Sequence, residues 1–142
     1  MGCLTLFGFS LGLVLRADLG LAPWDVFHQG VSQQLGWSLG TVIVATSFVV
    51  VVLWIPIRER PGIGTLANAV LVGIWVDVSL WILPEVLSSL VLRFVVLAVG
   101  IAVNGVATGL YIGARFGSGP RDGLMTGLAA RGYSVRVVRT II

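Results

Sequence analysis

The residues best suited to chemistry occur in a motif that the chain contains twice, spaced as Gly-x-x-Pro-x-Asp. The first copy spans residues 20–25 and the second spans residues 117–122. A glycine at this spacing ends an incoming helix, and a proline at the first position of the next helix places the aspartate in its first turn. There the carboxylate faces free backbone N–H groups and the positive end of the helix dipole. Each motif therefore predicts a helix start whose aspartate either only caps the helix or also contacts a ligand or ion.

Transporters built from internal repeats place glycine- and proline-interrupted helices around their substrate. On that basis nine residues of the two helix starts are predicted to bind a substrate: Gly20, Pro23, Trp24, Asp25, His28, Gly117, Pro120, Arg121 and Asp122. Asp25, Asp77 and Asp122 are the candidates for coupling to an ion or a proton. His28 is the only histidine and its counterpart in the second copy is Met125, so an ordinary polar role at the membrane interface is the alternative for this side chain.

The elements that must position these residues are helices in a membrane. The chain is 57% apolar and 11% charged, with a mean hydropathy of +1.04, whereas soluble domains carry about 25% charged residues. Nine arginines against six acidic residues are too sparse for a nucleic-acid-binding face. A lone cysteine and a lone histidine provide neither a disulfide nor a metal site. No catalytic Ser/His/Asp set and no phosphate-binding Gly-Lys motif is present, so we expect no enzyme activity and no cofactor.

Three long apolar runs predict transmembrane helices at residues 38–57, 63–83 and 87–112. Each is close to the roughly 20 residues that a helix needs to cross a bilayer. The first apolar stretch, residues 3–15, is short for a span. The tryptophans fall mostly toward the ends of these runs and suit anchoring at the membrane interface. We expect an all-α, multi-pass protein of the cell's inner membrane, with residues 1–142 forming one transmembrane domain.

An internal repeat organises this domain. Residues 7–34 align without gaps on residues 104–131, with eight identical positions. The first repeat covers about residues 4–57, a connecting span covers 63–83, and the second repeat covers about 87–142, whose last span the chain is expected to lack. If neither motif helix crosses the membrane, the repeats are inverted and seven of the nine arginines lie on the inside, as the positive-inside rule favours.

Polar residues within the spans predict contacts between helices. Asp77 and Arg93 lie at similar depth if the second and third long spans form an antiparallel pair, which predicts an ion pair that serves as a structural clasp, in gating or in substrate contact. Asn68 and Asn104 are expected to form hydrogen bonds between helices, with a ligand-facing role as the alternative. Glycines at every fourth position predict close packing, against the other repeat or a second subunit of a homo-oligomer: Gly8, Gly12, Gly105, Gly109 and Gly113.

Three stretches carry a resemblance to a known family: GLAPWDVFHQGVSQQLGWSLGT, PGIGTLANAVLVG and GLYIGARFGSGPRDGLMTGL. The sequence resembles the YczE/YyaS/YitT family of bacterial integral membrane proteins, and looks closest to its YczE-like branch. The resemblance covers the chain from Leu6 onward. It implies a polytopic inner-membrane protein of about five or six helices, and it supplies neither a reaction nor a substrate.

The function that the sequence favours is a small transporter or permease for a small molecule or an ion. In this hypothesis the two Gly-x-x-Pro-x-Asp helix starts meet at a central site, where their free N–H groups contact an anionic group and their aspartates couple to an ion. The alternative is a membrane scaffold or accessory protein, whose glycine faces recruit partner subunits and whose motifs only cap helices.

Overall fold

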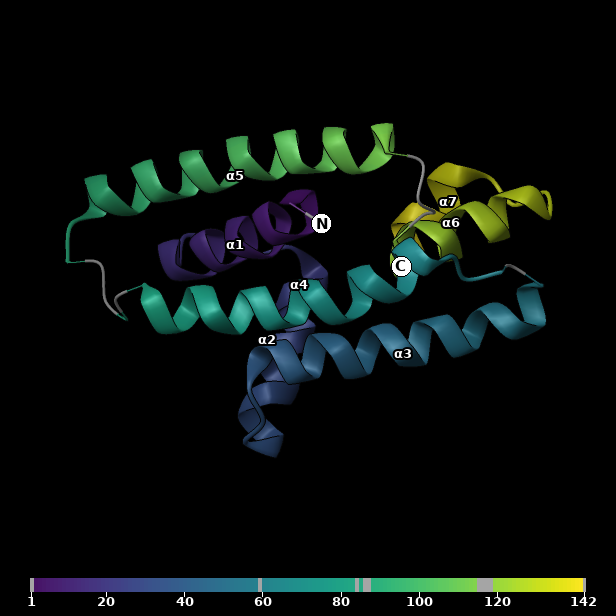
Figure 1. Cartoon of the computed structure of the whole chain (residues 1–142), viewed down its shortest axis with the longest axis horizontal. Helices are drawn as coiled ribbons and strands as arrows, with labels where there is room; N and C mark the ends of the chain where they lie inside the picture. The colour runs from purple at the N-terminus through teal and green to yellow at the C-terminus, as the bar shows by residue number, and fades with distance from the viewer. Residues whose placement is uncertain (1, 59, 84, 86–87, 115–118, 142) are drawn as a thin grey trace.

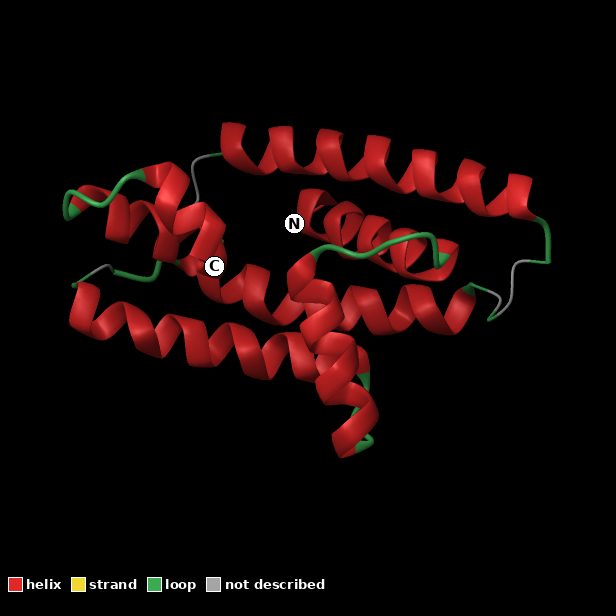
Figure 2. Cartoon of the chain, turned by 180° about the vertical axis from the view of Figure 1, so that it is seen from behind, coloured by secondary structure: helices red, strands yellow, loops and turns green. Residues whose placement is uncertain are grey.

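The computed structural model describes residues 2–58, 60–83, 85, 88–114 and 119–141, without the side chain of Arg121. Over these residues the chain forms seven α-helices and no strand (Figures 1 and 2). Their bounds are α1 Gly2–Ala17, α2 Pro23–Leu35, α3 Leu39–Ile57, α4 Ile63–Ile82, α5 Leu90–Gly113, α6 Pro120–Ala130 and α7 Val135–Ile141. The predicted all-helical class is confirmed.

Three of these helices, α3, α4 and α5, are long and apolar enough to cross a membrane. They coincide with the three predicted spans, although the third begins at Leu90 instead of residue 87. Helices form here because a chain in hydrocarbon must satisfy its backbone hydrogen bonds internally. The first apolar stretch forms α1, a helix of 16 residues, which is shorter than a bilayer normally requires.

Helix α1 lies between α4 and α5 and packs against both (Figure 1). The predicted direct pairing of α4 with α5 is therefore wrong, because the backbones of these two helices are not adjacent over their described residues, and Tyr111 of α5 reaches α4 only through its side chain. They are antiparallel, but α1 fills the space between them. The hydrophobic core lies along this central helix and its neighbours, with Leu4 of α1 packing among Ile43, Val72 and Val76.

Glycines allow α1 to approach α4 closely, as predicted for Gly8 and Gly12. A Cβ atom added at Gly8 would lie 2.6 Å from Trp75 Cβ, and one at Gly12 would overlap the Ser79 side chain. The prediction does not hold for the α5 glycines within this chain. A Cβ atom at Gly105, Gly109 or Gly113 would meet nothing within 4 Å, so this face of α5 makes no close contact with the described residues.

The short helices lie at the two ends of α3. Helix α2 runs across the beginning of α3, and α6 with α7 lies beside its end (Figures 1 and 2). Ser38 caps α3 by accepting a hydrogen bond from the Thr41 N–H, and Gly36 ends α2 in a left-handed conformation with φ of 68°. The chain therefore turns sharply between α2 and α3, so α2 lies across the long helices instead of continuing along them.

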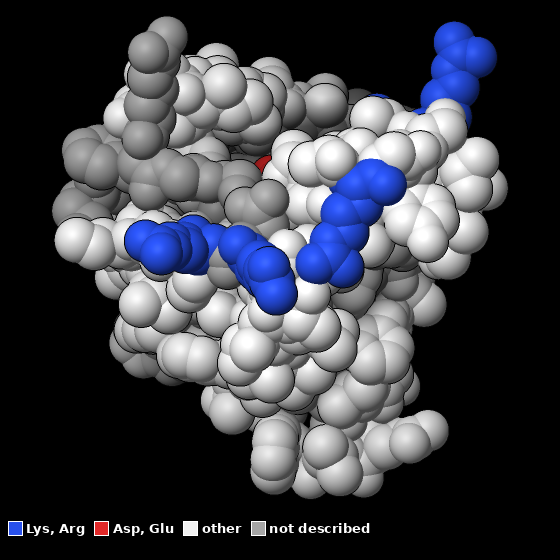
Figure 3. Space-filling model, turned by 90° about the vertical axis from the view of Figure 1, so that its right-hand side faces the viewer, with Lys and Arg blue, Asp and Glu red and all other residues white. Residues whose placement is uncertain are grey.

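Arginines gather at the end of the molecule where α3 and α6 finish (Figure 3). Arg58 caps the C-terminus of α3. The Arg131 guanidinium donates a hydrogen bond of 2.7 Å to the Pro56 carbonyl, which brings the end of α6 to the end of α3. Arg60 follows α3, and Arg136 and Arg139 lie on α7, which packs against α6. We call these five residues the arginine-rich end.

Candidate functional site

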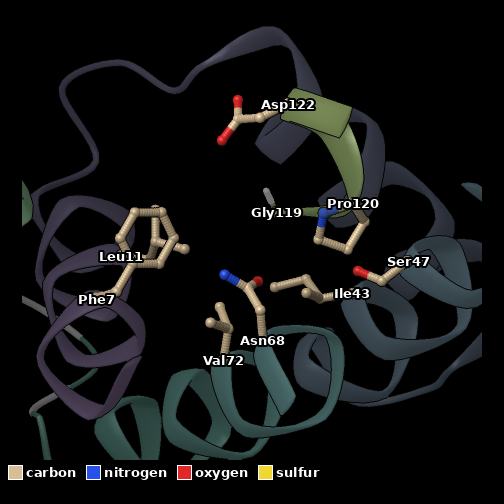
Figure 4. Close-up of a pocket in the computed structure, with 9 residues that line it drawn as sticks. All are labelled: Phe7, Leu11, Ile43, Ser47, Asn68, Val72, Gly119, Pro120 and Asp122. Carbon is tan, nitrogen blue, oxygen red and sulfur yellow. The ribbon is translucent and has the colours of Figure 1, made fainter. Parts of the chain in front are cut away.

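A pocket of about 170 Å³ lies where α1, α3, α4 and the start of α6 meet (Figure 4). Apolar side chains form one part of its wall, and an amide, a hydroxyl and a carboxylate form the rest. The lining residues are Phe7, Leu11, Ile43, Ser47, Asn68, Val72, Gly119, Pro120 and Asp122. We call this cavity the polar pocket. A mostly apolar cavity with a few convergent polar groups is the usual form of a small-molecule site.

Two polar side chains of the pocket converge on the backbone at Gly119. A Cβ atom added at Gly119 would lie 3.5 Å from Asp122 Oδ2 and 3.7 Å from Asn68 Nδ2. The carboxylate of α6 and the amide of α4 therefore face one point, which is open because residue 119 has no side chain. Within the described part of the chain Asp122 has no ion pair, and the Asn68 side chain interacts with the Tyr111 hydroxyl. Asp122 is exposed and Asn68 is half-buried, so a ligand can reach both side chains.

Tyr111 of α5 adds a third polar group beside this pair. Its hydroxyl oxygen is buried and forms no hydrogen bond of ordinary geometry. It interacts with the Asn68 side chain, which joins α5 to α4 at this point. Buried hydroxyl groups normally find a partner, so the region around Asn68 contains more hydrogen-bonding capacity than the described residues use.

The start of α6 is held in place by Trp54 of α3. The Trp54 indole N–H donates a hydrogen bond of 3.0 Å to the Pro120 carbonyl, and only 2% of Trp54 is exposed. This tryptophan lies near the end of α3, as the sequence indicated, but it packs against α6 instead of presenting its ring to the surroundings. Its position in the sequence, near the end of an apolar run, did not reveal that α6 would return to cover it.

The polar pocket lies near the middle of the long helices. Leu11, Ser47 and Val72 are each close to the midpoint of their own helix. From this level α6 runs to the arginine-rich end over 11 residues, which corresponds to about 16 Å at 1.5 Å per residue, or half of the hydrocarbon thickness. Helix α6 is thus a half-helix, too short to cross a bilayer, whose N-terminus opens on the polar pocket.

The second copy of the motif contributes directly to this pocket. Pro120 is the first residue of α6 and Asp122 lies in its first turn, as the motif predicts. Both line the pocket. Gly117 lies outside the described residues, and of Arg121 only the backbone, within α6, is described.

The first copy forms the predicted helix start but lies elsewhere. Pro23 begins α2, Asp25 lies in its first turn, and Gly20 lies in the connection that precedes it. Asp25 and His28 are buried, at 7% and 1% exposure. The Trp24 ring lies 6.2 Å from the His28 ring, measured between centroids.

The two helix starts do not meet. Helix α2 packs against α3 and not against α6, and no residue of α2 lines the polar pocket. The expected convergence is therefore wrong for the described residues. The physical reason is that α1 and α4 fill the centre of the bundle, so that α2 and α6 are held at opposite ends of α3. What Trp24, Asp25 and His28 do there stays a prediction.

Asp77 caps a helix and does not pair with Arg93, which corrects the predicted ion pair. One Asp77 oxygen accepts a hydrogen bond of 2.7 Å from the Gly40 N–H, and the other accepts one of 2.7 Å from the Ser38 hydroxyl. Arg93 instead lies 3.9 Å from Asp18. Since α1 separates α4 from α5, Asp77 can reach the N-terminus of α3 but not α5.

The two asparagines differ in their surroundings. Asn104 accepts a hydrogen bond of 3.2 Å from Thr108 of its own helix, so its predicted bond to another helix is not observed. Asn68 lies in the polar pocket. The sequence showed that Asn68 is a polar residue within a predicted span. It did not show that α6 would pack here and bring Asp122 close to it.

The fold and this pocket define the class of the molecule: it is an α-helical membrane protein. The chain belongs to a family described as "Family of unknown function (DUF6198)", whose profile matches residues 1–142. This agrees with the resemblance seen in its motifs, since two relatives are named YczE and YyaS.

Three relatives give the extent of the similarity. An "Uncharacterized protein" of Haemophilus influenzae is 35% identical over 140 residues, which cover 96% of this chain and 63% of the relative. "Uncharacterized membrane protein YczE" of Bacillus subtilis is 36% identical over 94% of this chain and 62% of its own length. "Uncharacterized protein YyaS" of Bacillus subtilis is 26% identical over 98% and 71%. The chain thus spans less than two thirds of the first two relatives. No solved structure matches it.

Proposed function

We propose that this protein is a small permease of the inner membrane that binds its substrate in the polar pocket. The observation that carries this proposal is the convergence of Asn68 and Asp122, which face one point in the polar pocket. Asp122 lies in the first turn of α6 without capping it through its side chain, so its position facing the Asn68 amide supports a ligand site more than a cap alone. The half-helix α6 supports the proposal because transporters commonly present broken helices to their substrate at the bilayer midplane.

The arrangement of helices is compatible with inverted repeats. Helices α1 and α5, which begin the two repeats, lie side by side and run in opposite directions (Figures 1 and 2). Helices α2 and α6, the next in each repeat, lie at opposite ends of α3. In this proposal the arginine-rich end faces the cytoplasm, as the positive-inside rule favours.

Cysteine accessibility tests this orientation. Gln34 and Ala130 are both exposed, near the beginning and the end of α3 respectively. In a Cys3→Ala background of the longer parent protein, we expect a membrane-impermeant thiol reagent applied to intact cells to label Gln34→Cys and to leave Ala130→Cys unlabelled. Permeabilised cells provide the control, in which both should react. Labelling of both positions in intact cells, or of Ala130→Cys alone, would rule out the proposed orientation.

The permease function is tested by flux through Asp122. Proteoliposomes containing the purified protein would be loaded with a bacterial small-molecule extract, and mass spectrometry would follow which compounds leave. We expect at least one compound to leave in the presence of the wild type and to leave at least tenfold more slowly with Asp122→Asn, because a charged hydrogen-bonding partner contributes about 1.5–3 kcal/mol.

The matched control is Asp18→Asn, which removes an exposed carboxylate whose partner is Arg93. This variant should transport like the wild type. If no compound depends on Asp122 while the reconstituted protein is folded, the proposed permease function is wrong.

A scaffold protein is the second candidate, and the open face of α5 favours it. Gly105, Gly109 and Gly113 leave room for another helix to approach closely. Co-purification of a stoichiometric partner that is lost with Gly109→Leu, together with no flux for any compound, would favour the scaffold over the permease.

A further inference from the structure

We propose that the polar pocket selects a small organic cation, a molecule with one ammonium group and a short apolar body. The inference rests on the proposed function, because it takes the pocket to be the substrate site. It reverses the charge expected from the sequence, which predicted an anionic group at the helix starts.

The charge of the pocket carries the argument. Asp122 is the one charged residue among the described lining residues. Its carboxylate faces the cavity without an ion-pair partner in the described ranges (Figure 4). Asp122 is exposed, so its charge acts through solvent as well as across the cavity; an anion next to this carboxylate would be repelled, whereas a cation would be attracted.

The start of α6 offers little to an anion. Pro120, its first residue, has no N–H group, and the Gly123 N–H donates to the Gly119 carbonyl within the helix. The Pro120 carbonyl accepts from Trp54. Asp122 itself occupies the first turn, where its negative charge already compensates the helix dipole. The remaining donors of this first turn are the N–H groups of residues 121 and 122, and an anion that reached them would lie beside the Asp122 carboxylate. The helix start is therefore less favourable for an anion than for a cation.

The neutral groups fit an ammonium group. The oxygen atoms of the Asn68 amide and the Ser47 hydroxyl can accept hydrogen bonds from an N–H donor. Phe7 lies on the opposite wall, and an aromatic face also attracts a cation. Leu11, Ile43 and Val72 complete an apolar surface for the body of the molecule. At about 170 Å³ the cavity is smaller than the roughly 300–1,000 Å³ of drug-sized sites, so the ligand is small.

Three probes of equal shape and different charge test this inference: n-butylammonium, n-butanol and n-butyrate. The protein would carry Cys3→Ala and Leu11→Cys, which places a single thiol in the apolar part of the pocket wall and leaves the polar groups intact. The measurement is the rate at which a small maleimide modifies this thiol in purified protein as each probe is titrated. We expect n-butylammonium to slow the reaction saturably and more strongly than the other two probes.

Two variants in the same background identify the recognising group. Asp122→Asn should raise the half-protecting concentration of n-butylammonium at least tenfold, and Asp18→Asn should leave it unchanged. Stronger protection by n-butyrate, equal protection by all three probes, no protection at all, or no effect of Asp122→Asn would each overturn the cation assignment. The flux experiment tests the permease function separately. It asks whether transport of any compound requires Asp122, whatever the charge of that compound.

Discussion

Gly40→Ala is expected to destabilise the protein by about 3 kcal/mol, at the upper end of the usual cost of overpacking a core. Gly40 of α3 and Gly73 of α4 form a helix crossing in which the two backbones meet directly. A Cβ atom at Gly40 would overlap the Gly73 carbonyl oxygen and lie 2.6 Å from Asp77 Oδ2. Since one of these neighbours is backbone, the two helices would have to separate.

The matched control is Gly105→Ala, the same substitution within the long helix α5. There the added Cβ atom meets nothing within 4 Å, and alanine favours a helix over glycine by up to about 1 kcal/mol. Gly105→Ala should therefore leave the thermal unfolding midpoint of the detergent-solubilised protein unchanged or raise it. If Gly40→Ala and Gly105→Ala have equal midpoints, α3 and α4 do not cross as closely as described.

Asp77→Ala has the second large expected effect, a loss of about 2–3 kcal/mol of unfolding free energy. The substitution removes the part-buried hydrogen bond from the Gly40 N–H, and bonds of this kind to a charged group contribute about 1.5–3 kcal/mol. The bond from the Ser38 hydroxyl adds little because it is exposed and this hydroxyl keeps Thr41 as a partner. Because Asp77 lies on α4 and caps α3, its loss should loosen the same helix pair that Gly40 and Gly73 bring together. The measurement is again the unfolding midpoint, combined with hydrogen exchange of the first turn of α3.

Arg93→Ala tests whether Asp77 stabilises the protein by capping α3 or by forming the ion pair with Arg93 that the sequence predicted. Arg93 and Asp18 are both substantially exposed, with 31% and 79% of their side chains accessible, and pairs of this kind contribute about 0–1 kcal/mol. We therefore expect Arg93→Ala to change the midpoint little. If Arg93→Ala were as destabilising as Asp77→Ala, the result would instead support the Asp77–Arg93 ion pair that the sequence predicted.

Much of the fold could be predicted because a bilayer imposes strict requirements on single segments. The apolar runs predicted α3, α4 and α5 to within a few residues, since about 20 residues must cross without unsatisfied backbone groups. The Gly-x-x-Pro-x-Asp motifs predicted the starts of α2 and α6 at Pro23 and Pro120, because proline and glycine act on the backbone locally. Of the candidate site, the sequence identified Pro120 and Asp122.

The partners of these elements depended on tertiary structure. Lipid is as apolar as a neighbouring helix, so hydrophobicity alone does not specify which spans pack together. The insertion of α1 between α4 and α5 directed Asp77 to α3 instead of Arg93. The return of α6 into the bundle buried Trp54 and brought Asp122 to Asn68, while α2 remained at the other end of α3. Local sequence thus determines where helices begin and end, whereas a site made by four helices exists only once their packing places distant side chains together.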